Sequence, residues 1–299
     1  MDPMSRRRWL ATTAASVAAA RVISGSATAA LPPLPRFPVG VCDWMILKRQ
    51  KLGAFKLTAD IGADGVEVDM GGLGDRPTFD NKLTDPAVRD QFLNEAESLG
   101  LRVCSIAMSG FYAQSFAERE GIARVVQDAI DTTVAMGVTT IFLPLGVRSD
   151  LVQHPDLRPA VVARLQDAGK RAADAGVVIG IESALDAAGE VKLLDDIGSP
   201  AIRSYFNFAN ALQNGRDLHA EIRTLGADRI CQIHASNQDK FWLEKDPQID
   251  VPAVKKTLDE IGWHGWLVIE RSRDANDGRN VRGNFGANTR YLKSIFQAG

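Results

Sequence analysis

Three polar side chains that end short apolar segments could together hold one metal ion. Glu182 ends Gly180-Ile-Glu, His234 ends Gln232-Ile-His and Glu270 ends Val268-Ile-Glu. Side chains alternate along a strand, so the three polar groups would point away from the face that their isoleucines occupy. Two carboxylates and an imidazole in one concave site are costly unless they are paired or bind a cation. Such a mixed set suits Mn²⁺, Mg²⁺, Co²⁺ or Zn²⁺.

The segments that carry these residues belong to a repeated strand–helix pattern. Helical periodicity separates successive apolar segments, and glycine often stands where the helix would end, as in Leu99-Gly100-Leu101 and Ala175-Gly176-Val177. The predicted strands are Val39–Trp44, Asp64–Met70, Leu101–Met108, Val138–Gly146, Val177–Ser183, Ile202–Asn210, Ile230–Asn237 and Trp266–Ser272.

Eight strand–helix units predict a single-domain (β/α)8 barrel over residues 39–299. A doubly wound open sheet is the alternative. It is disfavoured because the first strand leads into Cys42-Asp-Trp-Met, where that fold would carry a glycine-rich phosphate loop. Active sites of such barrels lie at the carboxyl ends of the strands, and the three polar side chains lie at these ends.

Composition excludes several classes of protein. The chain has 299 residues, with 35 Lys+Arg against 37 Asp+Glu, and is 45% hydrophobic. This is ordinary globular composition, and the net charge of −2 does not indicate a nucleic-acid partner. Three cysteines cannot form a disulfide scaffold. Cys42, Cys104 and Cys231 fall within predicted strands, so we expect buried free thiols.

The first thirty residues have the pattern of an export signal. Ser5-Arg-Arg-Arg-Trp-Leu10 precedes an uncharged segment to Ala20, and Ala27-Thr-Ala29 is typical of a cleavage site. The uncharged segment is too short to span a bilayer. The arginines before it predict a twin-arginine signal over residues 1–30 and a periplasmic protein with no membrane contact after cleavage. A general secretory signal or a basic helix is the alternative. The proline-rich residues 31–38 predict an extended lead-in.

The order of the strand-end residues resembles that of the xylose-isomerase-like family of sugar isomerases and epimerases, which includes ketose 3-epimerases and is related to endonuclease IV. The segment from Gly262 to Glu270, Gly-Trp-His-Gly-Trp-Leu-Val-Ile-Glu, is similar to the family's approach to its eighth strand. The resemblance implies one divalent ion held by Glu182, Asn207, His234 and Glu270. Asn207 stands where the family usually has aspartate, so we expect weaker metal binding, or a metal site that has been lost.

The resemblance also implies a mechanism. Glu182 and Glu270 would remove and return a proton next to a ketone through an enediolate. The positions implied or suggested for substrate contact are Asn210, Lys240, Trp44, Glu67 and Trp242. Asp69 has the same parity as Glu67 and competes with it for a role in the site.

Export favours a non-phosphorylated keto-sugar or related polyol ketone as the substrate, because phosphorylated sugars are cytoplasmic metabolites. The same enolisation would also allow a lyase or dehydratase acting on a 3-keto-glycoside. A non-catalytic periplasmic sugar-binding barrel is a further alternative. A hydrolase or nuclease is disfavoured because only His234, among the histidines, ends a predicted strand. The family resemblance suggests a homodimer.

Overall fold

The computed structural model describes residues 32–298. The predicted export signal, residues 1–30, lies outside this range. Residues 32–38 form neither helix nor strand before the first strand begins. Within the described part of the chain, every helix is too short or too polar to cross a membrane.

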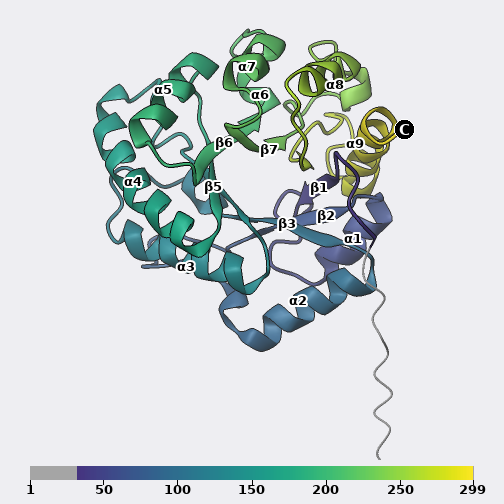
Figure 1. Cartoon of the computed structure of the whole chain (residues 1–299). Helices are drawn as coiled ribbons and strands as arrows, with labels where there is room; N and C mark the ends of the chain where they lie inside the picture. Colours follow the sequence, from purple (N-terminus) through teal and green to yellow (C-terminus); the bar gives the residue numbers. More distant parts are fainter. Residues whose placement is uncertain (1–31, 299) are drawn as a thin grey trace, which may run out of the picture. The chain divides into compact units, whose positions relative to one another are not determined.

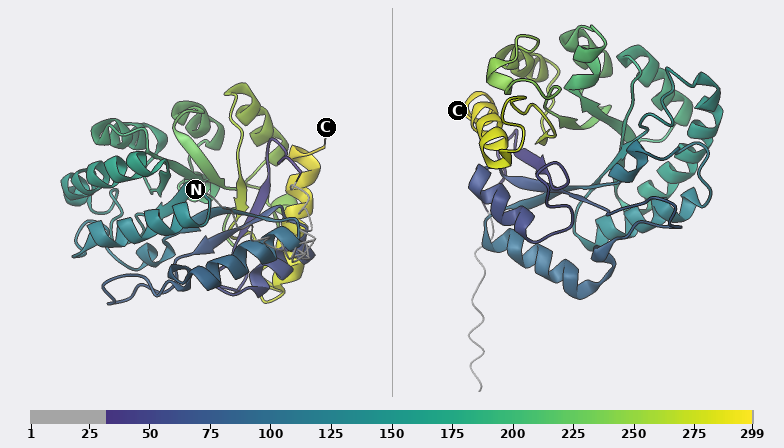
Figure 2. Two further views of the ribbon diagram at one scale, coloured as in Figure 1. Left: turned by 60° about the horizontal axis from the view of Figure 1, so that its bottom comes forward. Right: turned by 180° about the vertical axis from the view of Figure 1, so that it is seen from behind.

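Eight parallel strands close into a barrel, and helices surround it (Figures 1 and 2). Each strand pairs with the next in the sequence, and the last pairs with the first. This confirms the predicted (β/α)8 fold. The strands are β1 (Val39–Cys42), β2 (Gly65–Asp69), β3 (Arg102–Ala107), β4 (Thr140–Pro144), β5 (Val178–Glu182), β6 (Ile202–Asn207), β7 (Ile230–His234) and β8 (Leu267–Ile269).

The outer layer consists of α-helices with short 3-10 turns in the loops, and the last helix lies against the first to complete the ring (Figure 1). The helices are α1 (Gly53–Ile61), α2 (Pro86–Ser98), α3 (Ile122–Ala135), α4 (Arg158–Ala175), α5 (Ala187–Ile197), α6 (Phe208–Gln213), α7 (Leu218–Leu225), α8 (Val251–Glu260) and α9 (Val281–Phe296). The 3-10 turns are η1 (Lys82–Thr84), η2 (Ser109–Tyr112), η3 (Pro155–Leu157) and η4 (Leu243–Lys245).

Several predicted strands extend past the observed ends. The first, seventh and eighth were expected to reach Trp44, Asn237 and Ser272, but they end at Cys42, His234 and Ile269. The sixth strand was expected to continue to Asn210, but it ends at Asn207 and α6 begins at Phe208. The cause is local, because the Asn207 side-chain oxygen accepts a hydrogen bond of 2.9 Å from the backbone N–H of Ala209. An asparagine in this position caps the N-terminus of a helix.

Strand register sets residues of the predicted site beside one another on neighbouring strands. Asn207 on β6 is the register partner of His234 on β7, and Cys42 on β1 is the partner of Glu67 on β2. The three cysteines are free thiols. Cys42 and Cys104 are buried, as expected, whereas Cys231 is only partly buried.

Outside the barrel, on α5, lies a buried carboxyl group. Glu190 is 5% exposed, and its Oε2 accepts a hydrogen bond of 3.0 Å from Ser183 Oγ. Burial raises the pKa of this carboxyl to about 7, although the hydroxyls of Ser204 and Ser183 act in the opposite direction. In the unfolded chain the group ionises near its ordinary pKa of 4.5. The neutral Glu190 carboxyl therefore adds to the free energy of unfolding below pH 4.5, and this contribution is lost as the pH rises to about 7.

We predict that Glu190→Gln removes this pH dependence. The shift corresponds to about 3 kcal/mol, so at pH 8 the variant should have a higher free energy of unfolding than the wild type by up to about that amount. At pH 4 the two proteins should be similar. Urea unfolding at both pH values measures the difference. Glu97→Gln changes an exposed glutamate of α2 and serves as the control. An unchanged pH dependence in Glu190→Gln would contradict the account.

Candidate active site

The structure brings the ends of β5, β7 and β8 together around one imidazole. Nδ1 of His234 lies 3.0 Å from Oε2 of Glu182 and 3.9 Å from Oε2 of Glu270, which directly follows β8. His234 is fully buried, and the two glutamates are 7% and 4% exposed. The three side chains that strand alternation directed to one point therefore do converge.

Asn207 lies between the same two glutamates. Its Nδ2 donates hydrogen bonds to Oε2 of Glu182 at 3.0 Å and to Oε2 of Glu270 at 3.3 Å. Its oxygen is directed away, to the N–H of Ala209 at the start of α6. In this arrangement Asn207 presents a donor to the centre, and not the oxygen expected of a metal ligand.

Tyr112, at the end of η2, contacts the other oxygen of each glutamate. Its hydroxyl lies 3.2 Å from Oε1 of Glu182 and 3.1 Å from Oε1 of Glu270. Each glutamate thus directs Oε2 toward His234 and Asn207, and Oε1 toward Tyr112. Tyr112 carries no signal in the sequence, because it lies in a loop four residues beyond the predicted end of the third strand, where no alternation indicates its direction.

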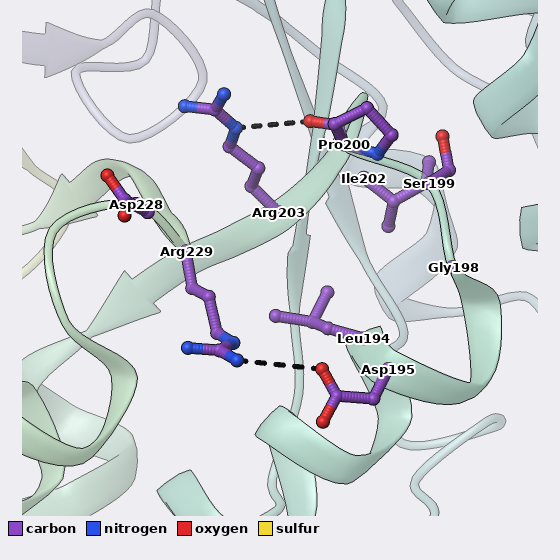
Figure 3. A pocket seen from close by; sticks show the side chains of 9 residues that line it. All are labelled: Leu194, Asp195, Gly198, Ser199, Pro200, Ile202, Arg203, Asp228 and Arg229. Carbon is purple, nitrogen blue, oxygen red and sulfur yellow. Dashed lines mark hydrogen bonds and ion pairs between the residues drawn. The ribbon is translucent and has the colours of Figure 1, made fainter.

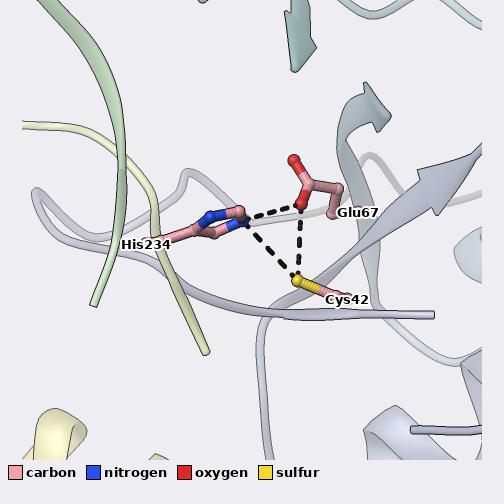
Figure 4. A group of neighbouring side chains, drawn as sticks. All are labelled: Cys42, Glu67 and His234. Carbon is pink, nitrogen blue, oxygen red and sulfur yellow. Dashed lines mark hydrogen bonds and ion pairs between the residues drawn. The ribbon is translucent and has the colours of Figure 1, made fainter. Parts of the chain in front are cut away.

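The other nitrogen of His234 is bound to Glu67 (Figure 4). Nε2 lies 3.0 Å from Oε1 of Glu67, and the Cys42 thiol lies 3.4 Å from the same oxygen. Glu67 is fully buried on β2. A carboxylate behind a histidine fixes which ring nitrogen carries the proton, and so leaves the opposite nitrogen free to act as a ligand.

The second oxygen of Glu67 is also occupied. Oε2 accepts hydrogen bonds from Ser105 Oγ at 2.6 Å and from the Tyr205 hydroxyl at 2.7 Å, and Gln232 donates to both of those hydroxyl oxygens. The sequence suggests a substrate contact for Glu67. The structure places it instead beneath His234, with both oxygens bonded to the chain's own donors.

These contacts shift two pKa values. Burial lowers the pKa of His234, but the charge of Glu270 and the hydrogen bonds to Glu182 and Glu67 outweigh it and raise the pKa to about 10. Burial raises the pKa of Glu270, and the nearby charge of Glu182 raises it further, while His234 opposes both. The cluster therefore concentrates negative charge that a cation would neutralise.

The residues fit a divalent metal on the Nδ1 side of the imidazole. One ligand atom from each of Glu182, His234 and Glu270 lies within 4.8 Å of the others, and carboxylate with imidazole is a common donor set for such ions. Cys42, Glu67 and His234 form a second group of that size on the Nε2 side of the ring, where both oxygens of Glu67 are already hydrogen-bonded to the chain.

Of the remaining predicted contacts, two lie beside the cluster. Trp44 stacks on Phe142 with ring centroids 6.2 Å apart, and Phe142 in turn contacts the His234 ring edge to face at 4.7 Å. Asn210 donates a hydrogen bond of 3.0 Å to the carbonyl oxygen of Ser183, which follows Glu182.

Lys240, Trp242 and Asp69 lie farther out or have other roles. Lys240 is exposed and lines a polar hollow of about 400 Å³ beside α6. The Trp242 indole N–H donates to Asn284 of α9 at 2.7 Å, which holds it in the outer layer. Asp69 pairs with Arg49, whose Nε lies 3.2 Å from its Oδ1.

Another hollow, of about 440 Å³, lies at the opposite end of the barrel (Figure 3). Residues at the starts of β6 and β7 line it, and there an Arg229 guanidinium nitrogen lies 3.6 Å from Oδ1 of Asp195. Because the polar cluster lies at the carboxyl ends of the strands, this hollow is separate from the candidate site.

Comparison with known proteins decides the family. A family model described as xylose isomerase-like TIM barrel matches residues 55–295. The chain belongs to this family. A 2-epi-5-epi-valiolone 7-phosphate 2-epimerase from Actinoplanes is 28% identical over 200 residues, which cover 64% of this chain and 70% of that protein.

Solved structures agree on the fold of this family member. A D-psicose 3-epimerase from Clostridium cellulolyticum, solved with D-tagatose, matches with a TM-score of 0.68 at 12% identity, covering 87% of this chain and 99% of that one. A 3-keto-D-glucoside 4-epimerase from E. coli matches with a TM-score of 0.66 at 14% identity, covering 86% and 99%.

We predict that Glu67→Gln weakens metal binding by about 10–100-fold, the usual effect of losing a carboxylate behind a histidine ligand. An amide has only one acceptor oxygen for the donors that converge on Glu67, so the imidazole would lose its fixed orientation. Calorimetric titration of the whole chain with Mn²⁺ measures the affinity. Glu97→Gln makes the same change at an exposed glutamate of α2 and should bind as the wild type does. Equal affinity in all three proteins would contradict the role of Glu67.

Proposed function

We propose that the protein is a metal-dependent epimerase or isomerase of a keto-sugar or related polyol ketone. The chain is an enzyme of the isomerase and epimerase type, as its curated relative is. One observation supports the specific reaction. Glu182 and Glu270 each direct one oxygen to the centre at His234 and keep a second oxygen apart from it. A carboxylate arranged in this way can help to hold a cation and still exchange a proton.

In the proposed reaction one glutamate removes the proton from the carbon beside the ketone, and the other returns a proton to the opposite face. A divalent ion held by Glu182, His234 and Glu270 would supply positive charge that stabilises the negative charge formed on the substrate oxygens. Glu67 keeps Nδ1 of His234 directed to the centre. Asn207 donates to both glutamates and holds their Oε2 atoms together. Trp44 would form an apolar wall.

We further propose that the substrate carries no phosphate. Two arginines at the barrel mouth are already paired, Arg49 with Asp69 and Arg273 with Asp239, whose Oδ1 lies 3.0 Å from the Arg273 Nε. The expected export signal supports the same choice of substrate. It also supports a periplasmic location with no membrane contact. The curated relative is named for a substrate that carries a 7-phosphate group. The rates of conversion of free and phosphorylated ketoses should therefore be compared directly.

A homodimer remains a prediction from the family resemblance.

We predict that Glu270→Gln strongly slows proton exchange at the substrate carbon. The wild type, loaded with Mn²⁺ in deuterium oxide, should place deuterium beside the carbonyl of a free keto-sugar, which NMR detects. Loss of one proton-transferring group should slow this by about 100-fold or more. Glu260→Gln, at a half-exposed glutamate of α8 paired with Arg223, is the control. Exchange at the wild-type rate in Glu270→Gln would remove Glu270 from the reaction.

We predict that Asn207→Asp binds Mn²⁺ more tightly, by about tenfold or 1.4 kcal/mol, and that its metal-free form is less stable. The substitution places a carboxylate oxygen where Nδ2 now lies, 3.0 and 3.3 Å from two other carboxylate oxygens, so repulsion is relieved only by a cation. Thermal unfolding with and without Mn²⁺ tests both effects. Asn210→Asp adds the same charge one helical turn away. Unchanged metal affinity in Asn207→Asp would show that residue 207 is not part of the metal centre.

A further inference from the structure

The Tyr112 hydroxyl joins the two oxygens that the proposed reaction uses for proton transfer. It lies 3.2 Å from Oε1 of Glu182 and 3.1 Å from Oε1 of Glu270. A hydroxyl has one hydrogen to donate and lone pairs with which to accept. One hydrogen cannot serve both carboxylates at once, so when one of the two glutamates is protonated the hydroxyl can accept from that one and donate to the other.

Inversion by two carboxyl groups creates a need for such a link. The glutamate that takes the substrate proton ends the turnover protonated, and the one that returned a proton ends it ionised. The enzyme must reverse this distribution before it can convert another molecule of the same substrate. The proton therefore has to travel from one Oε1 to the other.

Among the described residues, Tyr112 is the side chain that bonds to both Oε1 atoms. Asn207 also bridges the two glutamates, at their Oε2 atoms, but its amide N–H groups donate and do not accept a proton. Both glutamates are nearly buried, so direct exchange with bulk water is restricted.

The fold holds Tyr112 in this position from several sides. Its ring packs against Phe142 at 6.1 Å. The start of η2 is fixed because Asp69 accepts a hydrogen bond of 3.3 Å from the Ser109 N–H, and Arg49 donates to the Ser109 hydroxyl at 3.3 Å. On the other side Gly146 has φ +61, and a Cβ there would lie 2.9 Å from the Tyr112 Cα. The chain thus keeps this turn tightly against the end of β4.

We propose that Tyr112 is a further catalytic residue, which returns the proton from one glutamate to the other between turnovers. This rests on the proposed function. The protonated Oε1 of one glutamate gives its proton to the Tyr112 oxygen, and the original Tyr112 proton passes to the Oε1 of the other. Each O–H bond that breaks is matched by one that forms, and the tyrosine is unchanged after its hydroxyl turns. No other reactant is required.

The test is Tyr112→Phe in the whole chain loaded with Mn²⁺. The return of the proton between the two glutamates follows product release. Its loss should therefore lower kcat by tenfold or more, while kcat/KM stays within about twofold of the wild type. Imidazole buffer, which carries protons, should raise kcat of the variant as its concentration increases and leave that of the wild type unchanged. Tyr291→Phe removes a hydroxyl on α9 and should behave as the wild type.

Two measurements separate this role from a structural one. Mn²⁺ affinity by calorimetry should not fall, and the Mn²⁺-loaded chain should unfold at the temperature of the loaded wild type. A fall in metal affinity, or an equal fall in kcat and kcat/KM without rescue by imidazole, would overturn the relay. If wild-type protein exchanges no deuterium into any keto-sugar, the proposed function fails, and the relay fails with it. Exchange in the wild type without the expected change in Tyr112→Phe rejects the relay alone.

Discussion

The hydrogen bonds on both sides of the His234 ring are the interaction on which the rest of the site depends. Glu67 binds Nε2 and Glu182 binds Nδ1, each at 3.0 Å, so the imidazole is fixed between the barrel interior and the mouth. The ring is buried and packs against Phe142 and Tyr205. This arrangement divides the site into two parts: a closed network beneath the ring, and a centre above it where carboxylates converge.

The closed part supports the open one. Ser105 on β3 and Tyr205 on β6 donate to the Glu67 carboxylate, and Gln232 on β7 donates to both of their hydroxyl oxygens. Above the ring, two more carboxylates lie where burial makes like charges costly. In the metal-free chain Asn207 and Tyr112 donate to them, and these donors offset part of the repulsion. A cation would offset more of it.

The residues themselves explain how far sequence could predict this site. Glu182, His234 and Glu270 each follow an isoleucine in a strand, and alternation directs their side chains correctly to the mouth. Alternation also placed Glu67 inside the barrel, but its donors come from β1, β3, β6 and β7, and no local pattern indicates that they meet there. Asn207 was expected in a continuing strand because its capping of α6 depends on side-chain geometry. Tyr112 depends on a 3-10 turn packed against Phe142 and Gly146, which periodicity does not reveal.

The most direct test of this account is the position of a bound ion. Crystals of the protein grown with Mn²⁺ should show one anomalous peak at the manganese edge, on the Nδ1 side of His234 and within bonding distance of Glu182 and Glu270. Glu67 should still be hydrogen-bonded to Nε2. A peak on the Nε2 side, among Cys42, Glu67 and His234, or no peak at a saturating concentration of Mn²⁺, would contradict the central claim that Glu67 orients His234 toward a metal held at the barrel mouth.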